Sequence, residues 1–256
     1  QEPPAGSPDY NLAPTKQAPV VLTRPLRTSD EGYAAHGEAP VRQLRLLTWG
    51  LVPSWSTDVA GGVRMINARV ETVLSTNAFA RAVRARRCLV PASGWYEWQV
   101  SPTAHDAKGK PRKQPFFIHR GDGADCAFAG IYEFWRDPAV ADGEDPLAWL
   151  TTFSILTMAA EPGLDRIHDR QPLVLEPSAW SRWLDHGLTD PQEVQALATD
   201  LPTGRFAAYP VGRAVSSNRS NGPSLLDPAP VEELDGVVDP TTGEIVGGPD
   251  SPAGRP

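Results

Sequence analysis

Cysteine and long hydrophobic runs are the two features that this sequence largely lacks. Only Cys88 and Cys126 occur in 256 residues, so a disulfide-dense fold is excluded. The two cysteines do not form a Cys-x-x-Cys pair, so the sequence predicts neither a zinc site nor any other cofactor. No run of about 18 apolar residues occurs, so no membrane-spanning helix is expected. This pattern is typical of a reduced, cytoplasmic protein.

The formal net charge of -7 argues at first against a nucleic-acid partner. Most of it, however, lies at the C-terminus, where residues 227–256 hold seven acidic side chains and one arginine. The first 226 residues are therefore close to neutral, and they contain basic runs at 81–87 and 108–113. A near-neutral body with basic patches can bind phosphate, although each run can also be ordinary solvated surface.

Short strands dominate the expected secondary structure. Residues 41–49 alternate polar and apolar side chains, which is typical of a half-buried strand. Asp190, followed by Pro191 and Glu193, is a helix-capping pattern. Further strands are expected at 20–22, 63–68, 88–90, 95–100, 115–119, 127–134, 153–157 and 206–210, and further helices at 77–87 and 177–185. The elements predict an α+β fold with a curved, mostly antiparallel, barrel-like sheet and a few helices.

No linker-like break interrupts the expected strands, so a single domain is expected over residues 10–226. Residues 1–9 are rich in Pro, Gly and Ser and are expected to be irregular. The polar stretch 101–114 is expected to be a hairpin loop. Residues 227–256 contain few apolar side chains and many Pro, Gly, Asp and Glu, which predicts a disordered acidic tail.

Glu97 is the first candidate for proton chemistry. It lies between Trp95, Tyr96 and Trp98 on an expected strand, where alternate side chains point to opposite faces. A carboxyl group among aromatic rings is poorly solvated, which raises its pKa toward neutrality and suits it to acid–base catalysis. A strand glutamate that faces water or pairs with an arginine is the alternative.

Asn67 and Arg69 are two residues apart and so share one face of an expected strand. An amide can orient a sugar hydroxyl, and a guanidinium can bind a phosphate. An asparagine in a turn beside a surface arginine is the alternative.

His168 is the best placed of the five histidines, because Asp169 and Arg170 can orient it. Its unperturbed pKa of about 6.5 suits proton exchange at neutral pH, although a structural histidine has the same appearance in a sequence. Cys88 and Cys126 lie in apolar segments and are expected to be buried, unreactive thiols.

Seven segments together resemble the SRAP family, the SOS-response-associated peptidases that link covalently to abasic sites in single-stranded DNA. Each segment alone is modest, but their order along the chain is specific. They are Tyr10-Asn11-Leu12-Ala13-Pro14, 49–55, 66–72, 94–98, 113–118, 167–172 and 215–226. The resemblance implies one α+β domain with a barrel-like sheet around a DNA-binding groove.

The resemblance also implies the reaction. The amine and thiol of an N-terminal cysteine form a thiazolidine with the aldehyde of an abasic sugar. Asn67, Glu97 and His168 would be the catalytic residues, which position the sugar and move protons. Arg69, Trp55, Asn11, Pro53 and Ser54 would contact DNA, with Trp55 as a stacking surface. The peptidase step is the removal of the initiator methionine to free the amine. A monomer suffices, and binding to DNA would place it at the nucleoid.

Members of the family begin Met-Cys-Gly-Arg, whereas this sequence begins Gln1-Glu2-Pro3-Pro4. Only nine residues precede Tyr10, which favours a start upstream of Gln1 over a divergent member without crosslinking chemistry. Two other functions remain open. One is a non-catalytic module for single-stranded DNA or DNA junctions, which would bind undamaged strands with a strong salt dependence. The other is a conventional hydrolase, but the sequence has no Gly-x-Ser-x-Gly motif and no metal-ligand spacing.

Overall fold

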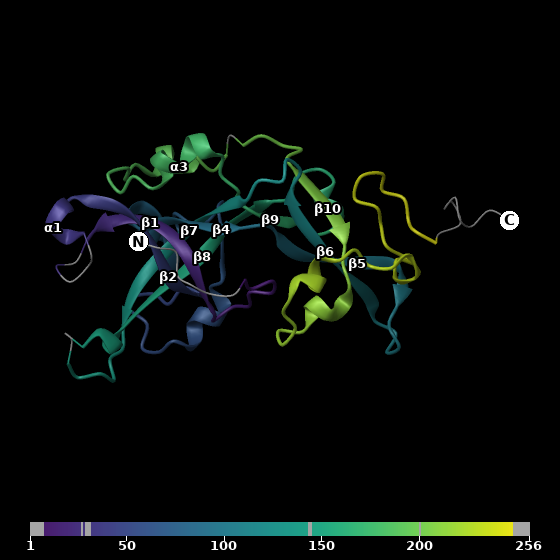
Figure 1. The fold of residues 1–256 in the computed structure, drawn as a ribbon, viewed down its shortest axis with the longest axis horizontal. Helices are drawn as coiled ribbons and strands as arrows, with labels where there is room; N and C mark the ends of the chain where they lie inside the picture. Colours follow the sequence, from purple (N-terminus) through teal and green to yellow (C-terminus); the bar gives the residue numbers. More distant parts are fainter. Residues whose placement is uncertain (1–7, 27, 29–31, 143–144, 200, 248–256) are drawn as a thin grey trace.

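The computed structural model describes residues 8–26, 28, 32–142, 145–199 and 201–247. The fold is α+β, with a large sheet, a small sheet beside it and a few short helices (Figure 1). None of the helices in these residues is long and apolar enough to cross a lipid bilayer. The strands are β1 Gln17–Pro25, β2 Pro40–Trp49, β3 Asn67–Arg69, β4 Arg87–Ala92, β5 Trp95–His105, β6 Pro111–Arg120, β7 Cys126–Arg136, β8 Trp149–Ala159, β9 Arg170–Pro172 and β10 Phe206–Pro210.

The large sheet closes into a five-stranded barrel in the order β2-β1-β4-β7-β8. The pairs along this path are antiparallel, and a short parallel contact between β2 and β8 joins the ends, with Thr48 opposite Thr152. Closure pairs the backbone N–H and C=O groups of the outer strands, which at an open sheet edge could pair with another chain. The expected curved, mostly antiparallel, barrel-like sheet is therefore confirmed.

β8 has partners along both edges. β7 pairs with its first half and β9 with its last residues, while β2 and β3 follow one another along the opposite edge. Its central side chains, from Thr152 to Thr157, are buried on both faces. Three of these six buried residues, Thr152, Ser154 and Thr157, are polar, so the strand is buried without being a continuous apolar run.

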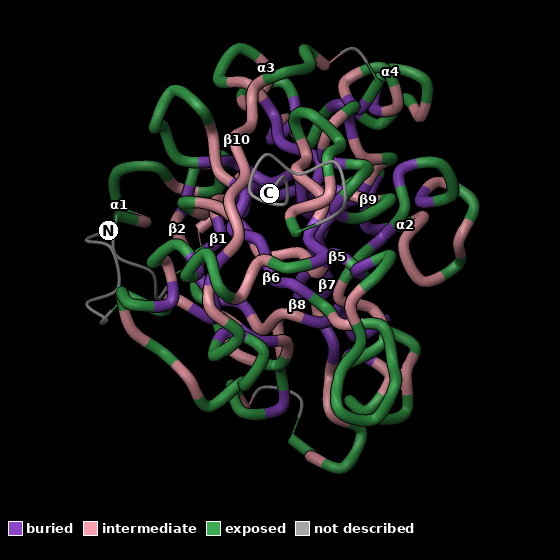
Figure 2. Tube along the Cα trace, turned by 90° about the vertical axis from the view of Figure 1, so that its right-hand side faces the viewer, coloured by how far each residue is buried: buried purple, intermediate pink, exposed green. Residues whose placement is uncertain are grey.

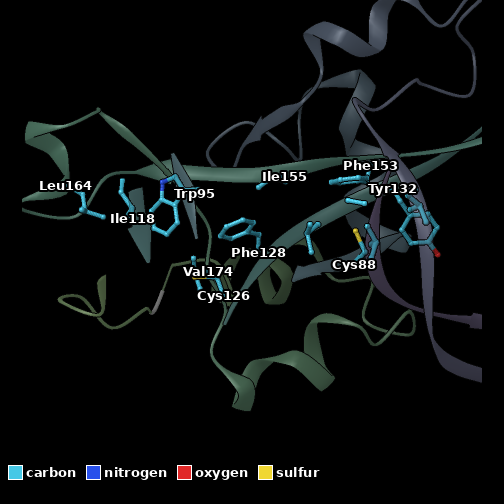
Figure 3. Close-up of a cluster of buried hydrophobic side chains, with 14 of the residues drawn as sticks. Cys88, Trp95, Ile118, Cys126, Phe128, Tyr132, Phe153, Ile155, Leu164 and Val174 are labelled. Carbon is cyan, nitrogen blue, oxygen red and sulfur yellow. The ribbon is translucent and has the colours of Figure 1, made fainter. Parts of the chain in front are cut away.

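The small sheet has the order β10-β6-β5 and is antiparallel throughout. A continuous apolar core joins it to the barrel (Figure 3). Trp95 of β5 packs edge-on against Phe128 of β7 and Phe206 of β10, with ring centroids 5.9 and 5.1 Å apart. Such aromatic pairs contribute about 0.5–1.5 kcal/mol each beyond the area they bury. The core therefore fixes how β5 lies against the barrel.

The helices lie outside this core. Exposed residues form the outside of the molecule and surround a buried centre (Figure 2). Val83 of α2 and Trp183 of α3 pack in a second apolar cluster with β4 and β7. The Trp183 indole N–H donates to the Cys88 carbonyl at 2.9 Å. The helices are α1 Tyr33–His36, α2 Asn77–Ala85, α3 Pro177–Trp183 and α4 Pro191–Ala196. As the capping pattern predicted, the Asp190 side chain accepts from the Gln192 N–H at the start of α4.

Two expected local structures differ from those observed. Residues 63–68 do not form one strand, because a 3-10 helix at Ala60–Arg64 precedes β3. Gly62 of this 3-10 helix packs against the backbone of Gly50. A Cβ atom on Gly50 would lie 2.7 Å from the Gly62 carbonyl oxygen. The polar stretch 101–114 is mostly strand rather than loop, and only its centre turns, with the Asp106 carboxylate accepting two backbone N–H groups.

The expectation of a disordered tail is wrong for residues 227–247. Val237 is 3% exposed and belongs to the core that joins the two sheets. Residues 236–246 form a small hairpin in which Val238 bridges to Ile245. Its turn is closed by the Asp239 carboxylate, which accepts from Thr241 N–H and Thr242 N–H. Mean composition predicts disorder, but a few well-placed apolar residues and a turn suffice for order. Residues 248–256 and 1–7 lie outside the described residues.

Gly94, which precedes β5, is required for close packing. A Cβ atom there would lie 2.3 Å from the Ile118 carbonyl oxygen and 2.5 Å from the Phe117 ring. We expect Gly94→Ala to lower the free energy of unfolding by about 1–3 kcal/mol, because backbone must move. Gly212→Ala is the control, since nothing lies within 4 Å of its added Cβ, and it should change stability by less than about 0.5 kcal/mol. Urea denaturation measures both; equal effects would contradict this packing argument.

Candidate functional site

A groove of about 1090 Å³ opens where the barrel meets the small sheet. Its walls come from parts of the chain that are far apart in sequence. Asn67, Glu97 and His168, the three residues that the sequence nominated for chemistry, all line it. The lining segments are 8–14, 17–19, Leu46, Trp49, 66–67, Arg69, 90–98, Phe117, Phe128, Phe153, Ile155, Thr157, His168, 170–172, 215–216, Asn218 and Leu226.

Glu97 lies on β5, and its side chain is 23% exposed. Burial raises the pKa of this carboxyl group to about 7, the nearby His168 opposes the rise, and Asp169 adds to it. A carboxyl group with this pKa is partly protonated at neutral pH, so it can both give and take a proton. The expectation that burial would raise the pKa of Glu97 is confirmed.

His168 faces Glu97 across the groove, with its Nδ1 atom 3.9 Å from the Glu97 Oε2 atom. The Arg170 backbone N–H donates to Nδ1 at 3.1 Å, which suits the neutral imidazole with its proton on Nε2. When Nδ1 is protonated, its neighbours are the Arg170 carbonyl oxygen at 3.2 Å and the Asp169 carboxylate at 3.3 Å. At this separation the imidazole and the carboxyl group are neighbours without a direct hydrogen bond between them.

Asn67 and Arg69 occupy β3, which runs parallel to β8 with Asn67 opposite Ile155. Both side chains are exposed and both line the groove. Within the described part of the chain, no hydrogen bond engages the Asn67 amide, which leaves its donor and acceptor available to a ligand. Arg69 places a positive charge at the same wall.

Arg170, which was expected to orient His168, lines the groove and also forms an ion pair that was not expected from the sequence. Its guanidinium binds both carboxylate oxygens of Glu71, at 2.7 and 2.9 Å, and donates to the Thr157 carbonyl at 2.6 Å. Because its own backbone N–H holds His168, this ion pair orients the imidazole. Glu71 lies in the turn that follows β3, 99 residues from Arg170, so no local pattern in the sequence indicates this pair.

Aromatic side chains form another part of the wall. The Tyr96 hydroxyl donates to the Tyr10 carbonyl at 3.0 Å, and the Trp98 indole N–H donates to Ser216 Oγ at 2.9 Å. Tyr96 and Trp98 lie on the face of β5 opposite to Glu97, as the strand pattern predicted, and still reach the groove. Flat apolar surfaces of this kind suit the stacking of nucleic-acid bases.

The remaining candidate DNA contacts are less well placed. Asn11 lines the groove, but its buried amide donates to the carbonyl oxygens of Val215, Ser217 and Ser220, at 3.0 to 3.2 Å. It therefore ties the first described segment to the 215–220 loop. Pro53 is buried, whereas Ser54 and Trp55 are exposed, and none of the three lines the groove.

The two cysteines are buried, as expected. Burial raises the pKa of both thiols, that of Cys126 to about 11, so neither is a reactive thiolate at neutral pH. Across the residues that the structure describes, no group of three or more His, Cys, Asp or Glu side chains gathers where a metal ion could bind.

Comparison with known proteins gives a consistent result. The family model "SOS response associated peptidase (SRAP)" matches residues 1–218. The chain belongs to this family. It is 30% identical to the abasic site processing protein YoqW of Bacillus subtilis, over 86% of each chain. It is 33% identical to the abasic site processing protein YedK of Escherichia coli, over 70% of this chain and 72% of YedK. With HMCES of Rattus norvegicus it shares 31% identity over 87% of this chain and 65% of that protein.

Solved structures share the fold. A protein from Bacteroides thetaiotaomicron superimposes with a TM-score of 0.64 at 24% identity, over 84% of this chain and 82% of that one. A phage-related protein from Bordetella bronchiseptica gives 0.58 at 30% identity, over 85% and 88%. This SRAP protein therefore has the α+β architecture that the resemblance implied.

Glu97 should make the stability of the protein depend on pH. Its folded pKa of about 7 lies above the ordinary 4.5, so the folded state binds more protons between these values. Stability should therefore fall as pH rises from 4.5 to 7, by up to about 3 kcal/mol. Glu97→Gln should remove this component and be more stable than the parent at pH 8. Urea titrations at pH 5 and pH 8 measure it.

The exposed Glu232 provides the control for this experiment. Glu232→Gln should retain the pH dependence of the parent. A parent-like pH dependence in Glu97→Gln as well would refute the assignment of the raised pKa.

Proposed function

We propose that this protein processes abasic sites in DNA and that the groove holds the lesion within a single strand. The observation that carries the proposal is the meeting of Asn67, Glu97 and His168 in one groove. The names of the relatives support it, since YoqW, YedK and HMCES are each called abasic site processing proteins. One copy of the chain supplies all three side chains, so a monomer suffices.

An abasic deoxyribose is a cyclic hemiacetal that opens to an aldehyde. In the proposed mechanism His168 moves the proton that accompanies ring opening, and the Asn67 amide orients the sugar. Glu97, with a pKa of about 7, accepts the proton that an attacking amine releases. Each task needs a group that changes its protonation or its hydrogen bonds near neutral pH, and the groove offers such groups within a short distance.

Phosphates of the strand would lie near Arg69, at the rim of the groove, and the bases would stack on Trp98 or Tyr96. Trp55, Pro53 and Ser54 could contact DNA only beyond the groove, since they do not line it. Asn11 would act indirectly, by holding the 215–220 loop beside the strand. Direct phosphate binding is therefore assigned first to Arg69.

The covalent step that we propose needs an N-terminal cysteine. Its α-amine attacks the aldehyde and loses water to give an imine. The thiol then adds to the imine carbon while its proton passes to the nitrogen, which closes a thiazolidine. Release of an initiator methionine would expose this amine, which is the peptidase step. Cys88 and Cys126 are internal and buried, so neither provides the required amine and thiol.

The covalent product gives a direct test. The 256-residue chain, which begins with Gln1, should give no denaturant-stable adduct with single-stranded DNA that contains one abasic site. The same chain preceded by a Met-Cys-Gly-Arg segment should give one. In that background, Glu97→Gln and His168→Ala should each slow the reaction about 100-fold or more, the typical contribution of acid–base catalysis.

A denaturing gel with labelled DNA follows the reaction, and Glu232→Gln should react at the parent rate. An adduct with neither version, together with ordinary binding to undamaged strands, would instead favour the non-catalytic DNA-binding module.

Salt dependence tests whether Arg69 binds a phosphate, with the uncharged Trp55 as the control. Arg69→Met should weaken binding to single-stranded DNA and reduce the slope of log affinity against log salt by about 0.7, the contribution of one phosphate contact. Trp55→Ala should leave that slope unchanged, because no charge is removed. Fluorescence anisotropy between low and physiological salt measures both variants. An unchanged slope in Arg69→Met would remove Arg69 from the interface.

A further inference from the structure

Gln99 is a buried side chain that joins three separate parts of the chain. It lies two residues beyond Glu97 on β5, on the same strand face, and it is 2% exposed. Its amide NH2 group donates to the Arg166 carbonyl at 3.0 Å and to the Val238 carbonyl at 2.9 Å. Its Oε1 atom accepts from the Val238 N–H at 2.8 Å. The Gln99 amide therefore joins three parts of the chain. They are β5, which carries Glu97, the loop of residues 160–169, which carries His168, and the C-terminal segment around Val238.

The C-terminal hairpin, residues 236–246, packs against β5 (Figure 1). Ser101 Oγ donates to the Gly236 carbonyl at 2.6 Å, and the Val237 side chain enters the core. Gly236 has φ 74°, and a Cβ atom there would lie 2.7 Å from Ser101 Oγ. This hairpin lies outside residues 1–218, the part of the chain that the family model matches.

The same hairpin covers the loop that presents His168. Arg166, two residues before His168, donates from its guanidinium to the Pro240 carbonyl at 2.6 Å and to the Thr241 carbonyl at 3.2 Å. Leu164 of the loop belongs to the same core cluster as Val237. The loop thus contacts the hairpin through both polar and apolar groups.

We infer that Gln99 and the C-terminal hairpin are positioning elements that hold His168 beside Glu97. The base of the loop is anchored to the barrel, where the Ala160 N–H donates to the Asp169 carbonyl at 3.0 Å. Its outer turn is anchored by Gln99 and Arg166. Releasing the outer turn lets the imidazole move away from the carboxyl group. The importance of this geometry for catalysis rests on the function proposed above; the anchoring itself does not.

Gln114 provides a matched control. It pairs with Gln99 across β5 and β6 and is 1% exposed, but its amide donates to the Val211 and Pro115 carbonyls. None of these contacts involves the His168 loop or the hairpin. Gln99→Met and Gln114→Met therefore remove equally buried amides, and only the first releases the loop.

Hydrogen exchange tests the anchoring without any DNA. By mass spectrometry, a peptide that spans 161–169 should exchange about tenfold faster or more in Gln99→Met than in the parent, as buried hydrogen bonds are lost. In Gln114→Met its rate should be that of the parent. If Gln99→Met does not fold, Arg166→Met decides, because it removes only the bonds to Pro240 and Thr241. An unchanged loop, or equal acceleration in both glutamine variants, would overturn the inference.

The titration of Glu97 reports on the pair directly. By carbon NMR of the carboxyl group, its midpoint should move from about 7 toward 4.5 in Gln99→Met. An open loop admits water and removes Asp169, and the loss of burial, which is the largest cause of the raised pKa, should exceed the opposite effect of losing His168. In Gln114→Met it should stay in place, and an unmoved midpoint in Gln99→Met would contradict the positioning role.

The adduct assay then separates the two proposals. With the Met-Cys-Gly-Arg segment present, Gln99→Met should slow adduct formation about tenfold while Gln114→Met does not. Absence of any adduct in the parent would refute the proposed function, whereas exchange and titration would still decide the anchoring.

Discussion

The pairing of β8 on both edges is the constraint on which the site depends. One edge of this strand holds β3, which carries Asn67, and the other holds β9, which begins at Arg170 and ends the loop of His168. The same strand closes the barrel through β2. Asn67 is therefore placed by hydrogen-bonded register to a single strand, and the same strand fixes the end of the loop that carries His168.

Glu97 reaches the groove by a different route. Its strand belongs to the small sheet, and the aromatic core around Trp95 sets how that sheet lies against the barrel. The junction of the two sheets removes much of the water around the carboxyl group, and this burial is what raises its pKa to about 7. The packing that creates the groove thus also creates the acid–base character of the group inside it.

Local patterns in the sequence were sufficient for much of the fold. The alternation over 41–49 predicted β2, and Asp190 with Pro191 predicted the start of α4, because both signals depend on neighbouring residues alone. Contacts between residues far apart in the chain were not predicted from these local patterns. Neither the pairing of β3 and β9 with β8 nor the hairpin on β5 follows from the local sequence, since each depends on partners about 11 to 140 residues away.

The same distinction holds for the site. Asn67, Glu97 and His168 were candidates by residue type and neighbours, and the family resemblance implied their catalytic roles; the structure brings all three to one groove. Asn11 and Trp55 were also predicted to contact DNA. The Asn11 amide, however, is hydrogen-bonded to the 215–220 loop, and the Trp55 side chain does not line the groove. A polar or aromatic residue in a family-like motif has the same appearance in sequence whether it supports the fold or contacts a ligand.

We propose that the groove between the two sheets receives an abasic strand beside Glu97 and His168. The most direct test follows backbone NMR resonances while a short single strand with a stable tetrahydrofuran abasic analogue is added. If the strand lies in the groove, the largest shifts should map to β3, to the start of β5 and to the His168–Arg170 segment, and Trp55 should be little affected. Shifts centred on Trp55 or on the arginines of α2, with the groove unchanged, would contradict it.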